Sequence, residues 1–259
     1  MIVDTHCHLN DKRFEEDLEE VIARAHDAGV VGMIIPGADP AELPRAIEIA
    51  EAHEDIYFAV GVHPYDKAAF DIDYLKQHIT HPKCIAVGEC GLDYFRLPDD
   101  AEAKEADKEA QKAIFRAQID LAKAYRKPLI VHIREASQDS LEILKNEHAG
   151  EVGGILHCYN ASPILLELAD AGFYYGIGGV VTFKNAKKLV EILPKIPKER
   201  LLIETDAPYL TPHPHRGERN EPFYTTLVAA KMAEILQMPQ NELEALVMEN
   251  TRRIFKGYF

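Results

Sequence analysis

The chain has 259 residues, 47% of which are hydrophobic, so it holds enough apolar material for one large domain or two small ones. It carries 29 Lys and Arg against 43 Asp and Glu, which gives a formal net charge of −14. This balance excludes a protein that coats nucleic acid through a broad basic surface, but it leaves room for a local cationic site.

The cysteine pattern and the N-terminal residues indicate the cellular compartment of the protein. The four cysteines show neither CxxC spacing nor the density of disulfide-stapled secreted domains, so we expect them to be reduced. The N-terminus lacks the basic start and apolar run of a signal peptide, and no segment approaches the roughly 18 apolar residues of a membrane helix. We therefore expect a cytoplasmic protein with no membrane partner and no obligate protein partner. The cysteines are Cys7, Cys84, Cys90 and Cys158.

Eight short apolar runs recur along the chain and predict eight β-strands. Most of them are near-continuous runs of Val, Ile, Leu and Tyr without polar alternation. Such runs are typical of strands that are buried on both faces of a parallel sheet. The predicted strands span residues 2–4, 30–36, 56–62, 84–88, 129–133, 154–157, 174–178 and 201–205.

Amphipathic stretches between these runs predict helices at residues 14–28, 41–53, 106–125, 137–147, 164–171 and 186–193. The tail, residues 221–259, is expected to form two more helices that separate near Met238 and Pro239. Eight strand-helix units in this length fit an α/β fold of the (β/α)8 TIM barrel type, in a single domain over residues 1–259, better than an open doubly wound sheet. Neither GxGxxG nor GxxxxGK[ST] is present, so the nucleotide-binding open sheets lack their phosphate loop here.

Side chains that can bind a metal ion occur at the carboxyl end of strand after strand. In a parallel barrel the active site lies at that end, so the fold brings together residues that are distant in sequence. The sequence therefore predicts a metal site at the C-terminal face of the strands. The residues are His6 and His8 after the first strand, His63 after the third, Glu89 after the fourth, His132 after the fifth, His157 after the sixth, and Glu204 and Asp206 after the eighth.

His6 and His8 form the most specific pair in this set. They are two residues apart on a strand, so both imidazoles face the same side, where they can hold one metal ion. Glu89 follows a buried apolar strand, where a lone carboxylate would carry a desolvation penalty unless it is paired or metal-bound. It could bridge two cations, and the alternative is a salt bridge to an arginine such as Arg134.

His132 and His157 each end an apolar strand and are further ligand candidates. Neutral imidazole suits zinc, while carboxylates widen the choice to manganese or magnesium, so the metal stays open. Asp206 is placed to orient a water and take its proton, and the alternative is a cap for the turn that follows. Glu204 shares the face of Asp206 and could fix the orientation of a ligand.

His63 precedes a proline that stops its strand. It would be a supernumerary ligand, so we expect it to contact substrate or protonate the leaving group, and a purely structural role is the alternative. Arg134 and Arg216 could donate to a phosphate at the mouth of the barrel, unless they are solvated loop charges. In the loop around Arg216, Arg219 and Asn220 could join them, whereas His213 and His215 are weaker ligand candidates.

Seven motifs, in order across residues 4–222, closely resemble the TatD family of metal-dependent hydrolases. They are Thr-His-Cys-His-Leu, Gly-Val-His-Pro, Gly-Glu-Cys-Gly-Leu-Asp-Tyr, Pro-Leu-Ile-Val-His-Ile-Arg-Glu-Ala, Leu-His-Cys-Tyr, Glu-Thr-Asp-Ala-Pro-Tyr-Leu and Arg-Gly-Glu-Arg-Asn-Glu-Pro. The resemblance implies a (β/α)8 barrel with two divalent metal ions (Mg, Mn or Zn) and DNase activity, often 3′ to 5′ on single strands. By motif, His6, His8, Glu89 and Asp206 would hold one ion, and Glu89, His132 and His157 the other.

The expected reaction is hydrolysis of a phosphodiester by a metal-activated water, with single-stranded DNA or another nucleic acid as the substrate. Glu89, Asp206 and His63 would be the catalytic residues, with Asp206 as the base and His63 as the acid. An alternative is a deacylase, lactonase or amidohydrolase that acts on a small ester or amide with the same centre. A third reading is a catalytically idle barrel that serves as a scaffold, but no ligand of the set is missing.

Overall fold

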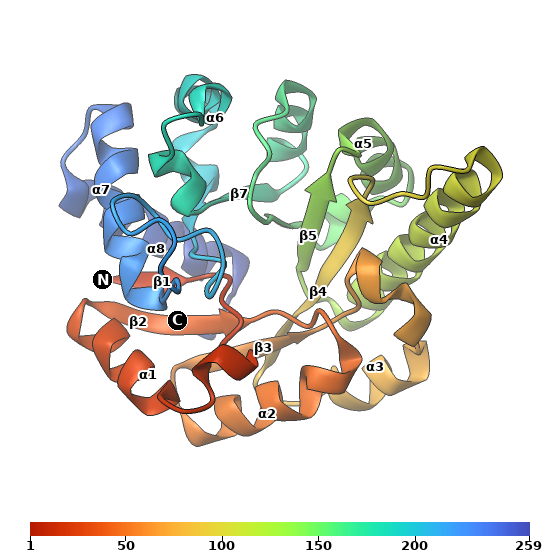
Figure 1. Ribbon diagram of the computed structural model, residues 1–259, viewed down its shortest axis with the longest axis horizontal. Coiled ribbons are helices and arrows are strands. Elements are labelled where there is room, and N and C mark those ends of the chain that lie inside the picture. Colours follow the sequence, from red (N-terminus) through yellow and green to blue (C-terminus); the bar gives the residue numbers. More distant parts are fainter.

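The computed structural model describes residues 1–259 and contains eight strands in one sheet. Each strand pairs in parallel with the next one in sequence, and helices surround the sheet (Figure 1). This arrangement is the (β/α)8 barrel that the sequence predicts. The strands are β1 (Ile2–Asp4), β2 (Val30–Ile35), β3 (Ile56–Val60), β4 (Cys84–Asp93), β5 (Leu129–Arg134), β6 (Gly154–Leu156), β7 (Phe173–Ile177) and β8 (Leu201–Ile203).

The barrel is closed between β1 and β8 by backbone hydrogen bonds at the end where the candidate ligands lie. The Thr5 N–H donates to the Ile203 oxygen at 3.2 Å, and the Asp206 N–H donates to the His6 oxygen at 2.9 Å. The His8 N–H donates to the Ala207 oxygen at 2.7 Å. The first and last strands thus hold His6, His8 and Asp206 in a fixed register.

The barrel interior is packed with apolar side chains below the candidate ligands. Ile130 and Leu202 stand two residues before His132 and Glu204, so they point to the same side of their strands. They belong to one buried cluster, and the side chains beneath the site therefore form a filled core and not a pore. The cluster consists of Ile34, Ala59, Ile85, Ala86, Ile130, Ile155, Tyr174, Leu202 and Phe255.

Eight α-helices cover the outside of the barrel. On α1, Leu18, Val21, Ile22 and Ala25 are buried, and this spacing places them on one face of the helix against the core. None of the helices combines the length and apolar character that a membrane crossing requires. The helices are α1 (Leu18–Asp27), α2 (Leu43–Ala52), α3 (Ile72–His78), α4 (Ala101–Tyr125), α5 (Ser137–Asn146), α6 (Lys187–Ile192), α7 (Thr225–Leu236) and α8 (Gln240–Ile254).

Three helix predictions differ from the structure. Helix α4 starts before the predicted residue 106, because the Asp100 side chain accepts from a backbone N–H of the first turn. Helix α3 was not predicted, and it is short and capped by Asp71 in the same way. The segment predicted as a helix at 164–171 is a 3-10 helix, Pro163–Ala169. Most other element boundaries differ by a few residues.

Strand β4 is longer than the predicted 84–88, so Glu89 lies within the strand and not after it. Its pairing with β5 continues to Asp93, opposite Arg134. Gly88 and Gly91 flank Glu89 with φ values of 142°, and a Cβ at either position would overlap a backbone oxygen of β5. The glycines therefore allow the close backbone approach that brings Glu89 beside His132.

Candidate metal centre

Five strands deliver the six candidate ligands to one end of the barrel. The side chains come from within β4 and β5 and from the residues that directly follow β1, β6 and β8. Five of them form two groups that share His6, one with His8 and Asp206 and one with Glu89 and His157, and the ligand atoms of each group lie within 4.8 Å of one another. His132 contacts Glu89. The six residues are His6, His8, Glu89, His132, His157 and Asp206.

Four of these side chains converge on one point. The Nε2 atom of His6 lies 3.3 Å from Nε2 of His8, 3.3 Å from Oε2 of Glu89 and 3.6 Å from Oδ1 of Asp206. The Nε2 atom of His8 lies 3.4 Å from the same Asp206 oxygen and 3.8 Å from the same Glu89 oxygen. The side chain of Asp206 thus faces these histidines and does not cap the following turn.

The second carboxylate oxygen of Glu89 faces a different set of imidazoles. Its Oε1 lies 2.8 Å from Nδ1 of His132, 3.6 Å from Nε2 of His157 and 3.7 Å from Nε2 of His63. The two oxygens of one buried carboxylate therefore belong to two donor sets. Arg134 forms no ion pair with Glu89, so the simple salt bridge is wrong.

These contacts keep Glu89 ionised. Burial alone would raise its pKa, but the charge of His157 and hydrogen bonds from His132 and His6 hold the pKa of Glu89 well below its usual value. Burial also opposes the ionisation of Asp206, and the hydrogen bond from His8 and the charge of His157 keep the pKa of Asp206 below its usual value. Both carboxylates are therefore anionic at neutral pH.

Glu204 lies behind His157, on the side away from the other ligands. Its Oε1 accepts a hydrogen bond from the Cys158 N–H at 2.7 Å and lies 3.0 Å from Nδ1 of His157. Burial opposes protonation of His157, but Glu204, Glu89 and Asp206 outweigh it and raise the pKa of His157 to about 10. A carboxylate at Nδ1 orients the ring so that Nε2 faces the centre, as the sequence predicts for Glu204.

The donor set fits divalent cations. Two ligands at about 2.1 Å from a tetrahedral ion lie about 3.4 Å apart, and the spacings around His6 and His8 agree with this value. Imidazole nitrogens combined with carboxylate oxygens suit zinc, manganese and related ions. In the metal-free centre, protonated His157 supplies the positive charge beside Glu89 and Asp206, and a divalent cation would supply it in its place.

Asp93 is a site residue that the sequence analysis missed. Its Oδ2 lies 2.9 Å from Nε2 of His132, and with His63 and His132 it forms a third group of potential ligands. Because His132 also contacts Glu89 through Nδ1, its ring is held between two carboxylates. The signal was present, since Asp93 belongs to the Gly-Leu-Asp-Tyr motif, but β4 was expected to end before it.

Asp4 is a second residue that the sequence did not reveal, and its side chain joins the segments that follow the first and last strands. Its carboxyl group accepts from the backbone N–H groups of His6 and Thr205, and from the Thr205 hydroxyl at 2.5 Å. Complete burial raises its pKa to about 8 despite these hydrogen bonds. Asp4 therefore holds the backbone on both sides of the centre without facing the ligands.

His63 lies at the edge of the centre. Its Nδ1 accepts a hydrogen bond from the Tyr65 N–H at 3.1 Å, and burial lowers its pKa to about 4. The ring is therefore neutral at pH 7 and carries its proton on Nε2, which faces the Glu89 oxygen. In this tautomer Nε2 is a hydrogen-bond donor.

The arginines predicted to contact substrate lie in different places. Arg134 is exposed, with its guanidinium 3.6 Å from the centre of the Phe95 ring. Arg216 lies over Phe183 and donates to the Thr211 oxygen. Among the weaker candidates of that loop, His215 contacts Glu218, Arg219 pairs with Asp17 and Glu221, and Asn220 is buried and donates to the Thr205 and Tyr209 oxygens.

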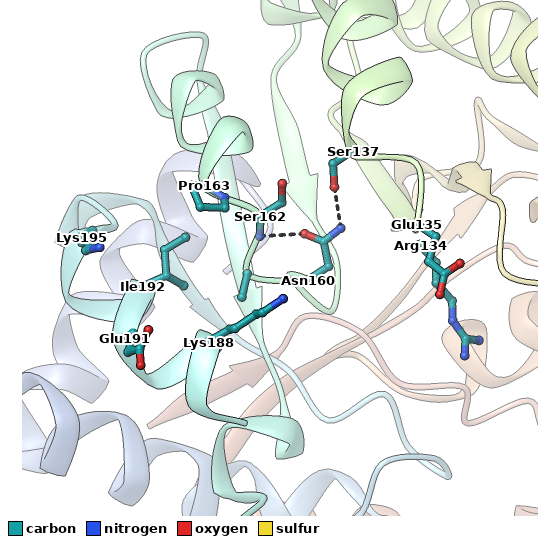
Figure 2. A pocket seen from close by; sticks show the side chains of 11 residues that line it. Arg134, Glu135, Ser137, Asn160, Ser162, Pro163, Lys188, Glu191, Ile192 and Lys195 are labelled. Atoms are coloured by element: carbon teal, nitrogen blue, oxygen red, sulfur yellow. Dashed lines mark hydrogen bonds between the residues drawn. The ribbon is translucent and has the colours of Figure 1, made fainter. Parts of the chain in front are cut away.

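Two cavities adjoin the centre on the side of β5, β6 and α6. The first, of about 850 Å³, reaches from His132, His157 and Asp206 to Lys188. The second, of about 640 Å³, shares Arg134, Asn160 and Lys188 with the first. Figure 2 shows Asn160 on its wall, where the side chain donates a hydrogen bond to Ser137 at the start of α5 and accepts one from the backbone N–H of Ser162. Arg216 lines neither cavity.

The fold and the donor sets define a metal-dependent hydrolase. The family model described as TatD related DNase matches residues 3–256. The chain belongs to this TatD family.

Two relatives and one solved structure are similar to this chain over nearly its whole length. The uncharacterized metal-dependent hydrolase YabD of Bacillus subtilis is 44% identical over 99% of both chains. The 3′-5′ ssDNA/RNA exonuclease TatD of Edwardsiella piscicida is 34% identical over 98% of this chain and 99% of its own. The crystal structure of the TatD homologue YJJV from Escherichia coli superimposes with a TM-score of 0.90, at 30% identity, over 98% of this chain and 97% of that one.

Proposed function

We propose that the protein is a metal-dependent deoxyribonuclease that hydrolyses phosphodiester bonds from the 3′ end of single-stranded DNA. The observation that carries this proposal is the position of Glu89, whose two oxygens belong to two donor sets at the mouth of the barrel. A carboxylate in this position can bridge two cations, and paired cations are the usual means of cleaving phosphodiesters.

In this proposal His6, His8, Glu89 and Asp206 hold one ion, and Glu89, His132 and His157 hold the other. When bound, the ions would lower the pKa of a coordinated water and stabilise negative charge on the phosphoryl oxygens. Glu204 keeps Nε2 of His157 directed into the centre, and Asp93 does the same for the ring of His132.

Two side chains act on protons and hydrogen bonds at the scissile group. Asp206 is ionised at neutral pH, so one of its oxygens can take a proton from the attacking water. His63 is neutral and carries its proton on Nε2, so it donates a hydrogen bond to an oxygen of the phosphate. Of the two roles expected for His63, the structure favours substrate contact over leaving-group protonation.

The charge of the chain makes metal a requirement for substrate binding as well as for turnover. Without cations, Glu89, Asp206 and Asp93 would repel a phosphate in a protein that already carries a net charge of −14. The Edwardsiella relative, named a 3′-5′ ssDNA/RNA exonuclease, supports a nucleic acid substrate for this chain.

The test is a time course with single-stranded DNA labelled at its 3′ or 5′ end. Metal-stripped protein is supplied again with magnesium, manganese or zinc, beside the Asp206→Asn variant. We expect stepwise loss of nucleotides from the 3′ end that needs metal and falls at least 100-fold in the variant. Intact DNA with confirmed metal binding would contradict the proposal and would favour an ester or amide substrate.

A further inference from the structure

Aromatic side chains gather at the end of the barrel that holds the metal centre. Six large apolar side chains of the chain are exposed, and three of them, Tyr65, Phe95 and Tyr209, follow β3, β4 and β8 on this side. Phe95 is 52% exposed and Tyr209 is 45% exposed. Exposed rings beside a candidate site can serve as contacts for a ligand.

Each of two exposed rings carries an arginine. The guanidinium of Arg134 lies 3.6 Å from the centre of the Phe95 ring, and that of Arg13 lies 4.3 Å from the centre of the Tyr209 ring. Arg13 is itself held by two hydrogen bonds to Asp11. Aromatic rings combined with arginine planes form the surfaces on which proteins stack unpaired bases.

The larger cavity beside the centre connects two of these groups, Tyr209 and Arg134, to the candidate ligands, whereas Phe95 lies outside its wall and packs under Arg134. Arg134, Lys187, Lys188 and Tyr209 line it, and Asp206 is the only carboxylate on its wall. Its volume of about 850 Å³ is in the range of pockets that enclose small organic ligands. Its apolar wall includes Ile133, Val180, Leu189 and Leu210.

The cations of this cavity have no acidic partner. Arg134, Lys187 and Lys188 take part in none of the ion pairs of the chain, although acidic residues outnumber basic ones by 43 to 29. Figure 2 shows Lys188 and Arg134 together with Asn160, whose side chain joins the loop after β6 to the start of α5. Unpaired cations beside a metal centre attract a second phosphate of the same substrate.

We propose that this cavity holds the nucleotides next to the scissile phosphate, in an unpaired strand. The ring of Tyr209 and the guanidinium plane of Arg134, which Phe95 supports from behind, contact the bases, and Lys187 and Lys188 contact a neighbouring backbone phosphate. This inference rests on the proposed function and adds to it the residues that select a single strand. A base in a duplex cannot offer its face to these rings because its neighbours cover it.

The test compares two substrates on the metal-loaded protein. The variants are Tyr209→Ala and Phe95→Ala, and the matched control is Tyr125→Ala at the end of α4, where the tyrosine is 37% exposed. We expect kcat/KM for single-stranded DNA to fall about 5- to 150-fold in each variant, from the 1–3 kcal/mol that one base stack contributes. A single strand whose 3′-terminal residues are abasic keeps the phosphates but has no bases to stack, so the variants should cleave it with the same kcat/KM as wild type.

The lysines are tested by salt dependence. Lys187→Gln combined with Lys188→Gln should lower the slope of log kcat/KM for DNA against log salt by about 0.7 per phosphate contact, and Lys198→Gln, exposed before β8, is the control. DNA cleavage equal to wild type in the aromatic and lysine variants, or equal losses for both substrates, would overturn the inference alone. Failure of the wild-type protein to cleave DNA would overturn the proposed function and the inference together.

Discussion

The replacement Glu204→Gln should weaken metal binding without unfolding the protein. Glu204 is fully buried, and its Oε1 accepts from the Cys158 N–H and lies 3.0 Å from Nδ1 of His157. A glutamine can keep its oxygen in this place, so the hydrogen bond from Cys158 is retained. The negative charge that supports the Nδ1 proton of His157 is lost, and Nε2 becomes a weaker ligand.

The size of this effect follows from the distance. Unit charges 3.0 Å apart interact by about 5.5 kcal/mol at an effective dielectric constant of about 20. A neutral imidazole that binds a metal acquires only part of a positive charge. Glu204 is therefore expected to stabilise the metal-bound His157 by about a quarter to a half of this energy. This share, about 1.4–2.7 kcal/mol, corresponds to a 10- to 100-fold loss of affinity, which is the usual effect of removing a partner of a metal-binding histidine.

The assay is calorimetric titration of metal-stripped protein with manganese, with thermal unfolding measured on the same samples. Glu199→Gln, an exposed carboxylate on the turn before β8, is the control and should bind metal like wild type. Manganese affinity within twofold of wild type in Glu204→Gln would refute the reasoning. A loss of affinity that accompanies unfolding of the metal-free variant would also refute it.

Three further predictions concern stability. Asp4→Ala leaves the buried donors of Thr205 without an acceptor, so urea unfolding at pH 7 should show a loss of about 3 kcal/mol, and Asp27→Ala on the exposed end of α1 should show little change. The hydrogen bonds from Arg13 lower the pKa of Asp11 to about 2, so its stabilisation is present above pH 4 and is lost as pH falls towards 2. Wild type and Asp11→Asn should therefore differ in free energy of unfolding by under about 1 kcal/mol above pH 4, as is usual for an exposed pair, and the difference should vanish as pH falls towards 2. A difference that stays constant with pH would contradict the lowered pKa of Asp11. Protein held at a metal concentration 100 times the dissociation constant should lose about 2.7 kcal/mol of its free energy of unfolding when a chelator removes the metal. An unchanged melting temperature would contradict a stabilising contribution of the ions.

The site was predictable where a ligand ends an apolar run. His132 and His157 follow uninterrupted runs of Ile, Leu and Val, and the common orientation of parallel strands then brings them to one end of the barrel. His6 and His8 were recognisable as a pair because residues two apart on a strand share a face. The structure brings these side chains to the same end of the barrel, on the two oxygens of Glu89.

The missed residues depend on contacts that are remote in sequence. Asp93 lies in a strand interrupted by Gly88 and Gly91, and glycine weakens the local signal for a strand, whereas pairing with β5 extends it. Asp4 contacts Thr205 across a separation of 201 residues, and nothing in the local sequence reveals this partner. The cavity beside the centre has the same origin, since its cations come from β5 and α6 and Tyr209 comes from the loop after β8.

Glu89 is proposed to link two cations in one centre. The most direct measurement is a titration of metal-free protein with manganese, followed by electron paramagnetic resonance, for wild type and for Glu89→Gln. The account predicts that wild type binds two ions per chain with the signal of an exchange-coupled pair, and that the variant loses this coupling. One ion per chain, or two ions with independent signals in the wild-type protein, would contradict it.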